Sequence, residues 1–203
     1  MSCLALTYQN MGQWKKAEAL QVVVMEKTKH LLGEEHPHTL TSMSNLALTY
    51  QKMGQWKEAE ALQVVEMEKA KHLFGEEHPD TLTSMSNLAV TYLNMGQWKE
   101  AEALQVVEME KSKHLLGEEH PDTLTSMSNL ALTYQDMGQW KEAEALQVVV
   151  MEKSKHILGE EHPHTLTRMS NLAATYSKLE QWKEAEALQL AVMEKTKHSS
   201  EHV

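Results

Sequence analysis

The sequence repeats itself every 42 residues, and this period constrains the fold more than any other feature of the chain. The period is clearest in the five tryptophans, which lie 42 residues apart at Trp14, Trp56, Trp98, Trp140 and Trp182. Self-similarity at a fixed period of about 20–50 residues is typical of proteins in which each unit packs against the next. We therefore expect a single repeat array rather than one or two globular domains. Its repeats are predicted at residues 1–35, 36–77, 78–119, 120–161 and 162–203.

Each copy has the pattern of two helices joined by a tight turn. In residues 36–77, Pro37 follows His36, and proline is favoured at the first position of a helix. Apolar residues then recur three and four positions apart, as on one face of a helix, at Leu40, Met43, Leu46, Ala47, Tyr50 and Met53. Gly54 ends this helix, and a second is predicted from about Trp56 to Phe74, before a left-handed cap at Gly75.

Short connections between helices make neighbouring helices antiparallel, and one such pair has more apolar surface than it can cover alone. Stacking of the copies is therefore required for a stable core. The predicted fold is an all-α, right-handed α-solenoid, or superhelix, of antiparallel helix–turn–helix repeats. The first copy begins partway through the unit, so we expect the chain to be a fragment of a longer protein.

The charge and composition exclude several classes of partner. The net charge of −10 disfavours nucleic acid and anionic membrane surfaces, because binding to both depends on Lys and Arg. The longest apolar runs, such as Val22–Met25, are too short for a signal peptide or a membrane span. The single cysteine, Cys3, has no partner for an internal disulfide. We therefore expect a cytoplasmic protein that does not bind nucleic acid or membrane.

The repeat unit resembles a known family. The run Asn45-Leu46-Ala47-Leu48-Thr49-Tyr50, followed by Gly54-Gln55-Trp56-Lys57-Glu58-Ala59-Glu60, is similar to the tetratricopeptide signature. The longer second helix, ending in Leu-Gly-Glu-Glu-His-Pro-Asp-Thr-Leu, resembles the 42-residue repeats of kinesin light chains. It resembles still more the arrays that follow NB-ARC ATPase modules in fungal receptor-like proteins. Because Gln63 and Glu66 stand where the family has an aromatic residue and an alanine, we expect the second helix to pack through Leu62, Val65 and Leu73.

The resemblance implies that the first helix of each repeat lines a groove that binds a peptide or protein. The family's contact positions fall on polar and small apolar residues, among them Gln51 and one asparagine per repeat. An asparagine amide can donate to and accept from the backbone of an extended peptide, although these amides could instead bond a neighbouring helix. The predicted groove residues are Thr41, Ser44, Asn45, Leu48, Lys52, Thr83, Ser86, Asn87, Val90, Asn94, Thr125, Ser128, Asn129, Leu132, Asp136 and Asn171.

The copies differ from one another at only a few positions. Two sets of these are Val24, Glu66, Glu108, Val150 and Val192, and His38, Asp80, Asp122, His164 and Arg168. These positions either set the specificity of the groove or have drifted on solvated faces, and drift is the simpler interpretation.

The residues that could perform chemistry do not form a recognisable site. The repeated His-Pro segments invite a metal hypothesis, but the two histidines of Glu34-Glu35-His36-Pro37-His38 flank a proline at a helix start and do not have the spacing of metal ligands. A role for these histidines as helix caps explains the pattern better. No phosphate-binding loop or catalytic triad is present. We therefore predict a protein without enzymatic activity, cofactor or metal.

Three functions remain for such an array. The first is the C-terminal recognition array of an NB-ARC-type signalling receptor. The second is a constitutive scaffold or a cargo adaptor of the kinesin light-chain kind, and the third is an engineered consensus repeat with no native ligand. Self-association is a further hypothesis, because the truncated first copy exposes an apolar face at Leu4 and Leu6.

Overall fold

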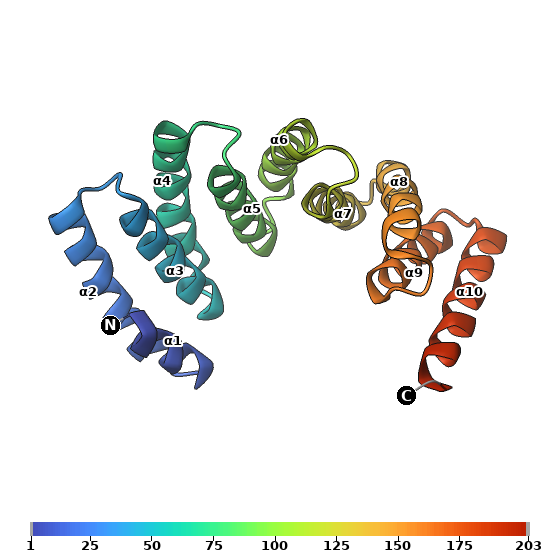
Figure 1. Ribbon diagram of the computed structural model, residues 1–203, viewed down its shortest axis with the longest axis horizontal. Coiled ribbons are helices and arrows are strands. Elements are labelled where there is room, and N and C mark those ends of the chain that lie inside the picture. Colours follow the sequence, from blue (N-terminus) through green and yellow to red (C-terminus); the bar gives the residue numbers. More distant parts are fainter. Residues whose placement is uncertain (1, 202–203) are drawn as a thin grey trace. The chain divides into compact units, whose positions relative to one another are not determined.

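A computed structural model describes the backbone of residues 2–201 and the side chains of residues 4–197, so the side chain of Cys3 lies outside the described part. Between residues 2 and 201 the chain forms ten helices and no strand (Figure 1). The helices are α1 (Ser2–Asn10), α2 (Trp14–Leu32), α3 (Pro37–Lys52), α4 (Trp56–Phe74), α5 (Pro79–Asn94), α6 (Trp98–Leu116), α7 (Pro121–Asp136), α8 (Trp140–Leu158), α9 (Pro163–Lys178) and α10 (Trp182–Glu201). The predicted all-α class and the predicted bounds of the two helices in residues 36–77 are confirmed.

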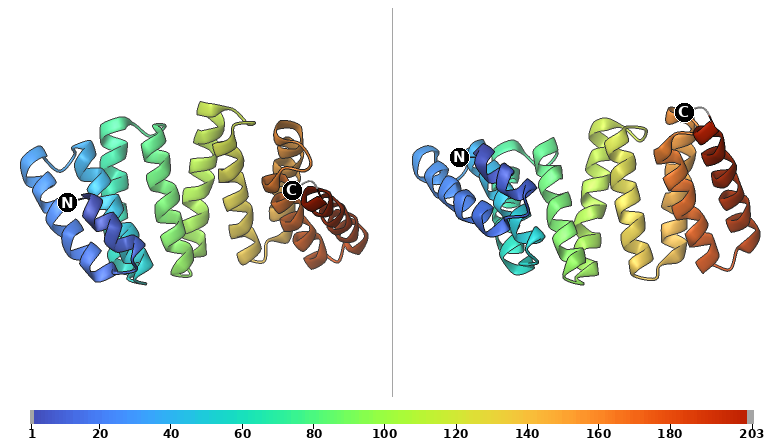
Figure 2. Two further views of the ribbon diagram at one scale, coloured as in Figure 1. Left: turned by 60° about the horizontal axis from the view of Figure 1, so that its bottom comes forward. Right: turned by 90° about the horizontal axis from the view of Figure 1, so that it is seen from below.

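The chain forms two compact units, one up to Leu104 and the other from Gln105, with the division inside α6. In the first unit α1 packs against α2, α2 against α3, α3 against α4, and α4 against α5. In the second unit α7, α8, α9 and α10 pack in the same sequential order. Figure 2 shows the successive helices of each unit side by side. Each of these helices therefore covers the apolar side of its neighbours in the sequence, as a solenoid requires.

The helices begin and end where the sequence indicates. At the start of α3 the Nδ1 atom of His36 accepts a hydrogen bond from the backbone N–H of His38 at 3.1 Å, and Pro37 takes the first helical position. His78, His120 and His162 cap α5, α7 and α9 in the same way. The predicted capping role of these histidines is confirmed. At the end of α4, Gly75 has φ 93° and ψ 165°, so it is not the left-handed helical cap that we predicted, but it still needs the positive φ that glycine allows.

The turn before α10 has Leu179 and Glu180 where the turns before α2, α4, α6 and α8 have methionine and glycine. Gly138, which precedes α8, has φ 74°, whereas Glu180 occupies the equivalent position before α10 with φ 60°. A residue with a Cβ atom is strained there by about 1 kcal/mol. We expect Glu180→Gly to raise the free energy of unfolding by up to about 1 kcal/mol, and Gly138→Ala to lower it by a similar amount, in urea titrations. Equal stability of all three proteins would contradict the argument.

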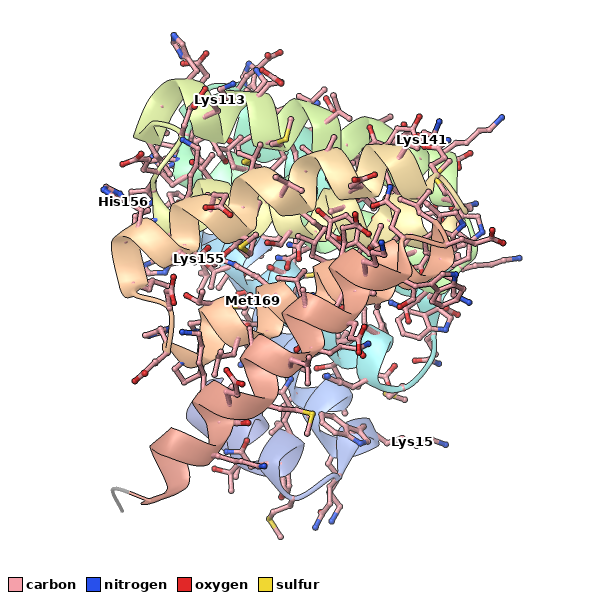
Figure 3. The ribbon with its side chains drawn as sticks, turned by 90° about the vertical axis from the view of Figure 1, so that its right-hand side faces the viewer. Lys15, Lys113, Lys141, Lys155, His156 and Met169 are labelled. Carbon is pink, nitrogen blue, oxygen red and sulfur yellow. The ribbon has the colours of Figure 1, made fainter. Side chains whose placement is uncertain are left out.

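The core consists of small clusters between successive helices. Leu40, Met43, Leu46 and Ala47 are buried, as predicted for the apolar face of α3. In the second unit Met169 packs with Met151 of α8 and with partly buried residues of α10, and Figure 3 shows it between these helices. Methionines contribute to these clusters: Met43, Met67 and Met85 are buried and Met109 is half-buried. Of the five tryptophans that mark the repeat period, Trp98 and Trp182 are exposed.

The predicted packing face of α4 is wrong. Val65 and Leu73 are 43% and 41% exposed, and Leu62 is only partly buried. The buried face instead contains Ala59, Gln63, Glu66, Met67 and Ala70. These positions recur at intervals of three and four from the turn at the helix start, so the helix keeps its register instead of rotating. Two polar side chains therefore enter the interior and require hydrogen-bond partners there.

Candidate functional site

A cleft of about 190 Å³ lies in the first unit between α3, α4 and α5. Five of the predicted groove residues line it: Thr41, Ser44, Asn45, Thr83 and Asn87. The remaining lining residues were not predicted, and they are Pro37, Leu40, Glu66, Ala70, Phe74, Asp80 and Ser84. The structure therefore brings together the predicted residues of two neighbouring repeats and adds a floor from the helix between them.

The asparagine amides of this face have no partner within the described part of the protein. Asn45, Asn87, Asn129 and Asn171 are half-buried, and none of their side-chain amides makes a hydrogen bond to another described residue. Only their backbone carbonyls are engaged, and each accepts from the threonine hydroxyl four residues later at 3.2–3.4 Å. The carbonyls of Asn45 and Asn87 also accept from Gln21 Nε2 and Gln51 Nε2 at 3.3 and 3.4 Å. The alternative that these amides bond a neighbouring helix is therefore not supported by any contact in residues 4–197. Their donors and acceptors remain available to a ligand.

The bonds between neighbouring helices are made by other residues. The hydroxyl of Thr91 on α5 donates to Gln63 Oε1 on α4 at 2.5 Å and accepts from Gln51 Nε2 on α3 at 2.7 Å. Equivalent hydrogen bonds link Gln9, Thr49 and Gln21 in the first unit, and Gln135, Thr175 and Gln147 in the second. Gln51, which the resemblance placed among the contact positions, is thus engaged within the protein. Gln63, at the position where the family has an aromatic residue, thus joins the two helices by a hydrogen bond.

The other predicted groove residues lie outside this cleft. On α3 and α5, Leu48, Lys52, Val90 and Asn94 are exposed and Ser86 is half-buried. Asn94 donates from its Nδ2 atom to the carbonyl of Val90 at 2.7 Å, within its own helix. In the second unit, α7 holds Thr125, Ser128, Asn129, Leu132 and Asp136, and α9 holds Asn171.

Glu66 forms an acidic floor in the cleft. Its side chain is 7% exposed, its Oε1 atom lies 2.7 Å from the Ser84 hydroxyl, and its Oε2 atom has no hydrogen-bond partner among the described residues. Burial raises the pKa of this carboxyl, and the nearby charge of Asp80 raises it further, against a smaller opposing effect of the Ser84 hydrogen bond. None of the described residues that line the cleft is a lysine, an arginine or a histidine. The cleft is therefore a negatively charged site without a cation in its lining.

The interpretation of the variable positions as drift on solvated faces is wrong for Glu66, Glu108 and Val150, which are all buried. They lie on the same helix face as the inward-facing alanine and glutamine of their repeat. A signal in the sequence could have revealed this. Glutamate at this position is followed 14 residues later by aspartate, as in Glu66 and Asp80 or Glu108 and Asp122, whereas Val24 and Val150 are followed by His38 and His164. Such joint changes indicate that the two positions share an environment.

Among the side chains that the structure describes, no three His, Cys, Asp or Glu residues converge on a point that could hold a metal ion. None of the described helices combines the length and the apolar character that a membrane span needs.

Comparison with known proteins identifies the repeats. Residues 81–122, 123–164 and 165–199 match one family model of the tetratricopeptide repeat, and residues 1–64 match another. The crystal structure of the nearly identical TPR-like repeats of a protein described as a putative kinesin light chain from Podosopora anserina superposes with a TM-score of 0.89 and 33% identity, over 98% of this chain and 94% of that chain. A second crystal structure of those repeats, in a form with one substituted residue, gives 0.91 and 32% over the same shares.

BtubC (BKLC) from P. vanneervenii shares the fold, with a TM-score of 0.87 and 20% identity over 98% of this chain and 79% of that chain. No curated protein matched the sequence.

Proposed function

Because the chain belongs to the tetratricopeptide repeat family and its repeats are of the kinesin light chain-like kind, we propose that it binds a peptide or protein through the first helices of its repeats, α3 and α5 in the first unit and α7 and α9 in the second. The bound segment is extended, and the asparagine amides pair with its backbone. In the cell the array acts as the C-terminal recognition part of a cytoplasmic NB-ARC-type signalling receptor, as the resemblance of its extended second helix implies.

The observation that supports binding is the set of half-buried asparagine amides without partners among the described residues. A half-buried amide loses part of its hydration, and protein side chains in this position are normally hydrogen-bonded. A peptide backbone offers both a donor and an acceptor to each amide. Asn45 of α3 and Asn87 of α5 also line the same cleft, so a single extended segment can reach both of them.

The proposal is tested by replacing Asn45 and Asn87 with alanine together. We expect the double variant to bind a peptide captured by the array about tenfold more weakly or worse, because each lost amide removes about 0.5–1.5 kcal/mol of hydrogen bonding. The melting temperature should change little, because the amides hold no other described residue in place. Calorimetric titration measures the affinity, and Glu58→Ala, at an exposed position of α4 outside the cleft, is the control. Undiminished binding by the double variant would rule out the clamp.

A second function is favoured by the structural relative that is described as a putative kinesin light chain. It is that of a constitutive scaffold or cargo adaptor. The sequence that precedes the array in its parent protein separates the two: a nucleotide-binding P-loop supports the receptor, and a heptad coiled coil supports the adaptor. The near-identity of the copies does not by itself indicate an engineered consensus array, because the related repeats are also described as nearly identical.

We also propose that the protein self-associates through α1 and α10, its first and last described helices. Leu4 and Leu6 of α1 are exposed, and Trp182, Leu190 and Met193 of α10 are exposed as well. Contact between two such faces would bury apolar surface in a head-to-tail arrangement. We expect the mass measured by light scattering to rise with protein concentration and Leu190→Glu to reduce this rise. A mass that stays at one chain over the whole range would contradict the proposal.

A further inference from the structure

We propose that the cleft between α3, α4 and α5 binds the positively charged side chain of an arginine or lysine in the peptide ligand, with Glu66 as the recognising carboxylate. The inference rests on the proposed function, and it adds the chemical class of the ligand. The ligand is a basic peptide segment, and the specificity resides in the one position of α4 that alternates between glutamate and valine among the repeats.

The surroundings of the Glu66 carboxylate favour a positively charged ligand. Its carboxylate is buried, only one of its oxygens has a donor, and the second carboxylate of the cleft, Asp80, repels it. Such an arrangement is unfavourable unless an opposite charge or further hydrogen bonds compensate it. The Nδ1 atom of His78 lies 3.8 Å from Asp80 Oδ2, and no described basic side chain forms an ion pair with Glu66. A guanidinium or ammonium group from a ligand would supply the donors that Glu66 lacks.

The equivalent place in the second unit already holds a guanidinium. There Val150 takes the position of Glu66, Arg168 takes that of Ser84, and Ser154 takes that of Ala70. The guanidinium of Arg168 donates a hydrogen bond to the hydroxyl of Ser154 and is half-buried between α8 and α9. The seam between two repeats therefore has room for an arginine head group. In the second unit Arg168 supplies that group and Val150 replaces the carboxylate, whereas in the first unit Glu66 lines an open cleft.

Glu108 shows what a more satisfied carboxylate looks like at the same position. Its Oε1 atom accepts from Ser126 at 2.5 Å and from Ser112 at 3.2 Å, both within the second unit. The residue equivalent to Ser112 in the first unit is Ala70, which has no hydroxyl. Glu66 thus has one donor fewer than Glu108, and the side chain of Ala70 leaves space beside it. This difference makes the α4 carboxylate the one that gains most from a bound cation.

The walls of the cleft suit the rest of such a ligand. Pro37, Leu40 and Phe74 form apolar surface on which the aliphatic part of an arginine or lysine side chain can lie. The amides of Asn45 and Asn87 flank the cleft and are placed to hold the backbone on either side of that side chain. Charge, apolar wall and backbone partners therefore lie together in one site.

The test selects ligands without assuming their charge. Random dodecapeptides displayed on phage are selected on the full chain, and the strongest binder is synthesised in two forms. One form has the selected sequence, and the other has each arginine replaced by neutral citrulline and each lysine by acetyl-lysine. Both are titrated against the natural protein, Glu66→Gln and the control Glu58→Gln, which removes an exposed carboxylate from the same helix.

We expect the selected peptides to contain a basic residue whose neutral form binds the natural protein about tenfold more weakly or worse. Glu66→Gln should cause a similar loss for the basic peptide and should not distinguish the two forms, whereas Glu58→Gln should behave as the natural protein does. If Glu66→Gln does not fold, Glu66→Val replaces it, because the chain itself uses valine at this position in Val24 and Val150.

Equal binding of the two peptide forms by the natural protein, or an unchanged charge preference in Glu66→Gln, would overturn the inference and leave peptide binding intact. Selection of no peptide at all would overturn the proposed function, and the inference with it. The two failures are therefore distinguishable.

Discussion

Replacement of Thr91 by valine is expected to lower the free energy of unfolding by about 2–4 kcal/mol. Valine has the shape of threonine but cannot donate to Gln63 Oε1 or accept from Gln51 Nε2. Both glutamines reach into the interface between helices, and an unpartnered buried polar group costs about 1–3 kcal/mol. Thr91 is fully buried and Gln63 nearly so, so water cannot replace the lost partner without opening the packing. Urea unfolding followed by circular dichroism measures the change.

The control for this substitution is Thr83→Val on the same helix. Thr83 is exposed, and its hydroxyl donates only to the Pro79 carbonyl within the first turn of α5. We expect its effect to stay within about 0.5 kcal/mol, as for most surface substitutions. A loss of the same size in both variants would show that the hydrogen-bonded chain through Thr91 has no special role in joining the repeats.

Replacement of Glu66 by valine is expected to have the opposite effect and to raise the free energy of unfolding at pH 7 by about 1–3 kcal/mol. The natural side chain buries a carboxylate whose second oxygen is unpartnered, and this imposes a cost of that order. Hydrophobic residues that replace buried charges are often stabilising. Ser84 keeps an acceptor in the variant, because its hydroxyl also lies 2.9 Å from the Asp80 carbonyl.

The pH dependence of this gain has a definite sign. The folded-state pKa of Glu66 lies above the ordinary value of 4.5. At pH values between 4.5 and the raised folded-state pKa, the folded protein binds more protons than the unfolded chain. The natural protein therefore loses stability as the pH rises through this range. The advantage of Glu66→Val should therefore be small near pH 4 and should grow toward pH 7.

The contribution of surface carboxylates to the free energy of unfolding changes with pH in the opposite direction, so it must be separated from that of Glu66. Hydrogen bonds from Lys29 and Lys69 lower the pKa of Glu34 to about 2, so any contribution from this pair is lost as the pH falls toward 2. It is present in both proteins and cancels when their stabilities are compared at each pH. Glu58→Gln provides the matched control for loss of an exposed charge. A stability difference that does not vary between pH 4 and pH 7 would contradict the assignment of this effect to Glu66.

Stability and binding are expected to depend on Glu66 in opposite directions. A change that removes the buried carboxylate should stabilise the array and at the same time abolish the preference for a basic ligand. This opposition is common where a site holds a group that only its ligand can satisfy. It also accounts for the alternation between glutamate and valine at one position of otherwise near-identical repeats.

The period, the helices and the capping histidines were determined by the sequence alone, because each depends on local contacts. Proline after His36 and glycine at residue 54 act within one turn of chain, and the spacing of Leu40, Met43 and Leu46 defines a helix face without reference to any other helix. The groove residues were predicted from the resemblance to the family, and five of them, on α3 and α5, line the cleft.

The tertiary structure alone decided which face of α4 is buried and which polar groups have partners. By residue type alone, Val65 and Leu73 are better suited to the interior than the polar side chains of Gln63 and Glu66. In the structure, however, Gln63 and Glu66 are buried, and Val65 and Leu73 are exposed. The reason is that Thr91 and Ser84 of α5, in the next repeat, donate hydrogen bonds to Gln63 and Glu66 and so offset part of the cost of burying these polar side chains. Ser84 and Thr91 lie 18 and 28 residues from their partners Glu66 and Gln63, so the periodicity of α4 cannot predict these hydrogen bonds. That one oxygen of Glu66 has no partner among the described residues is known only from the packed structure.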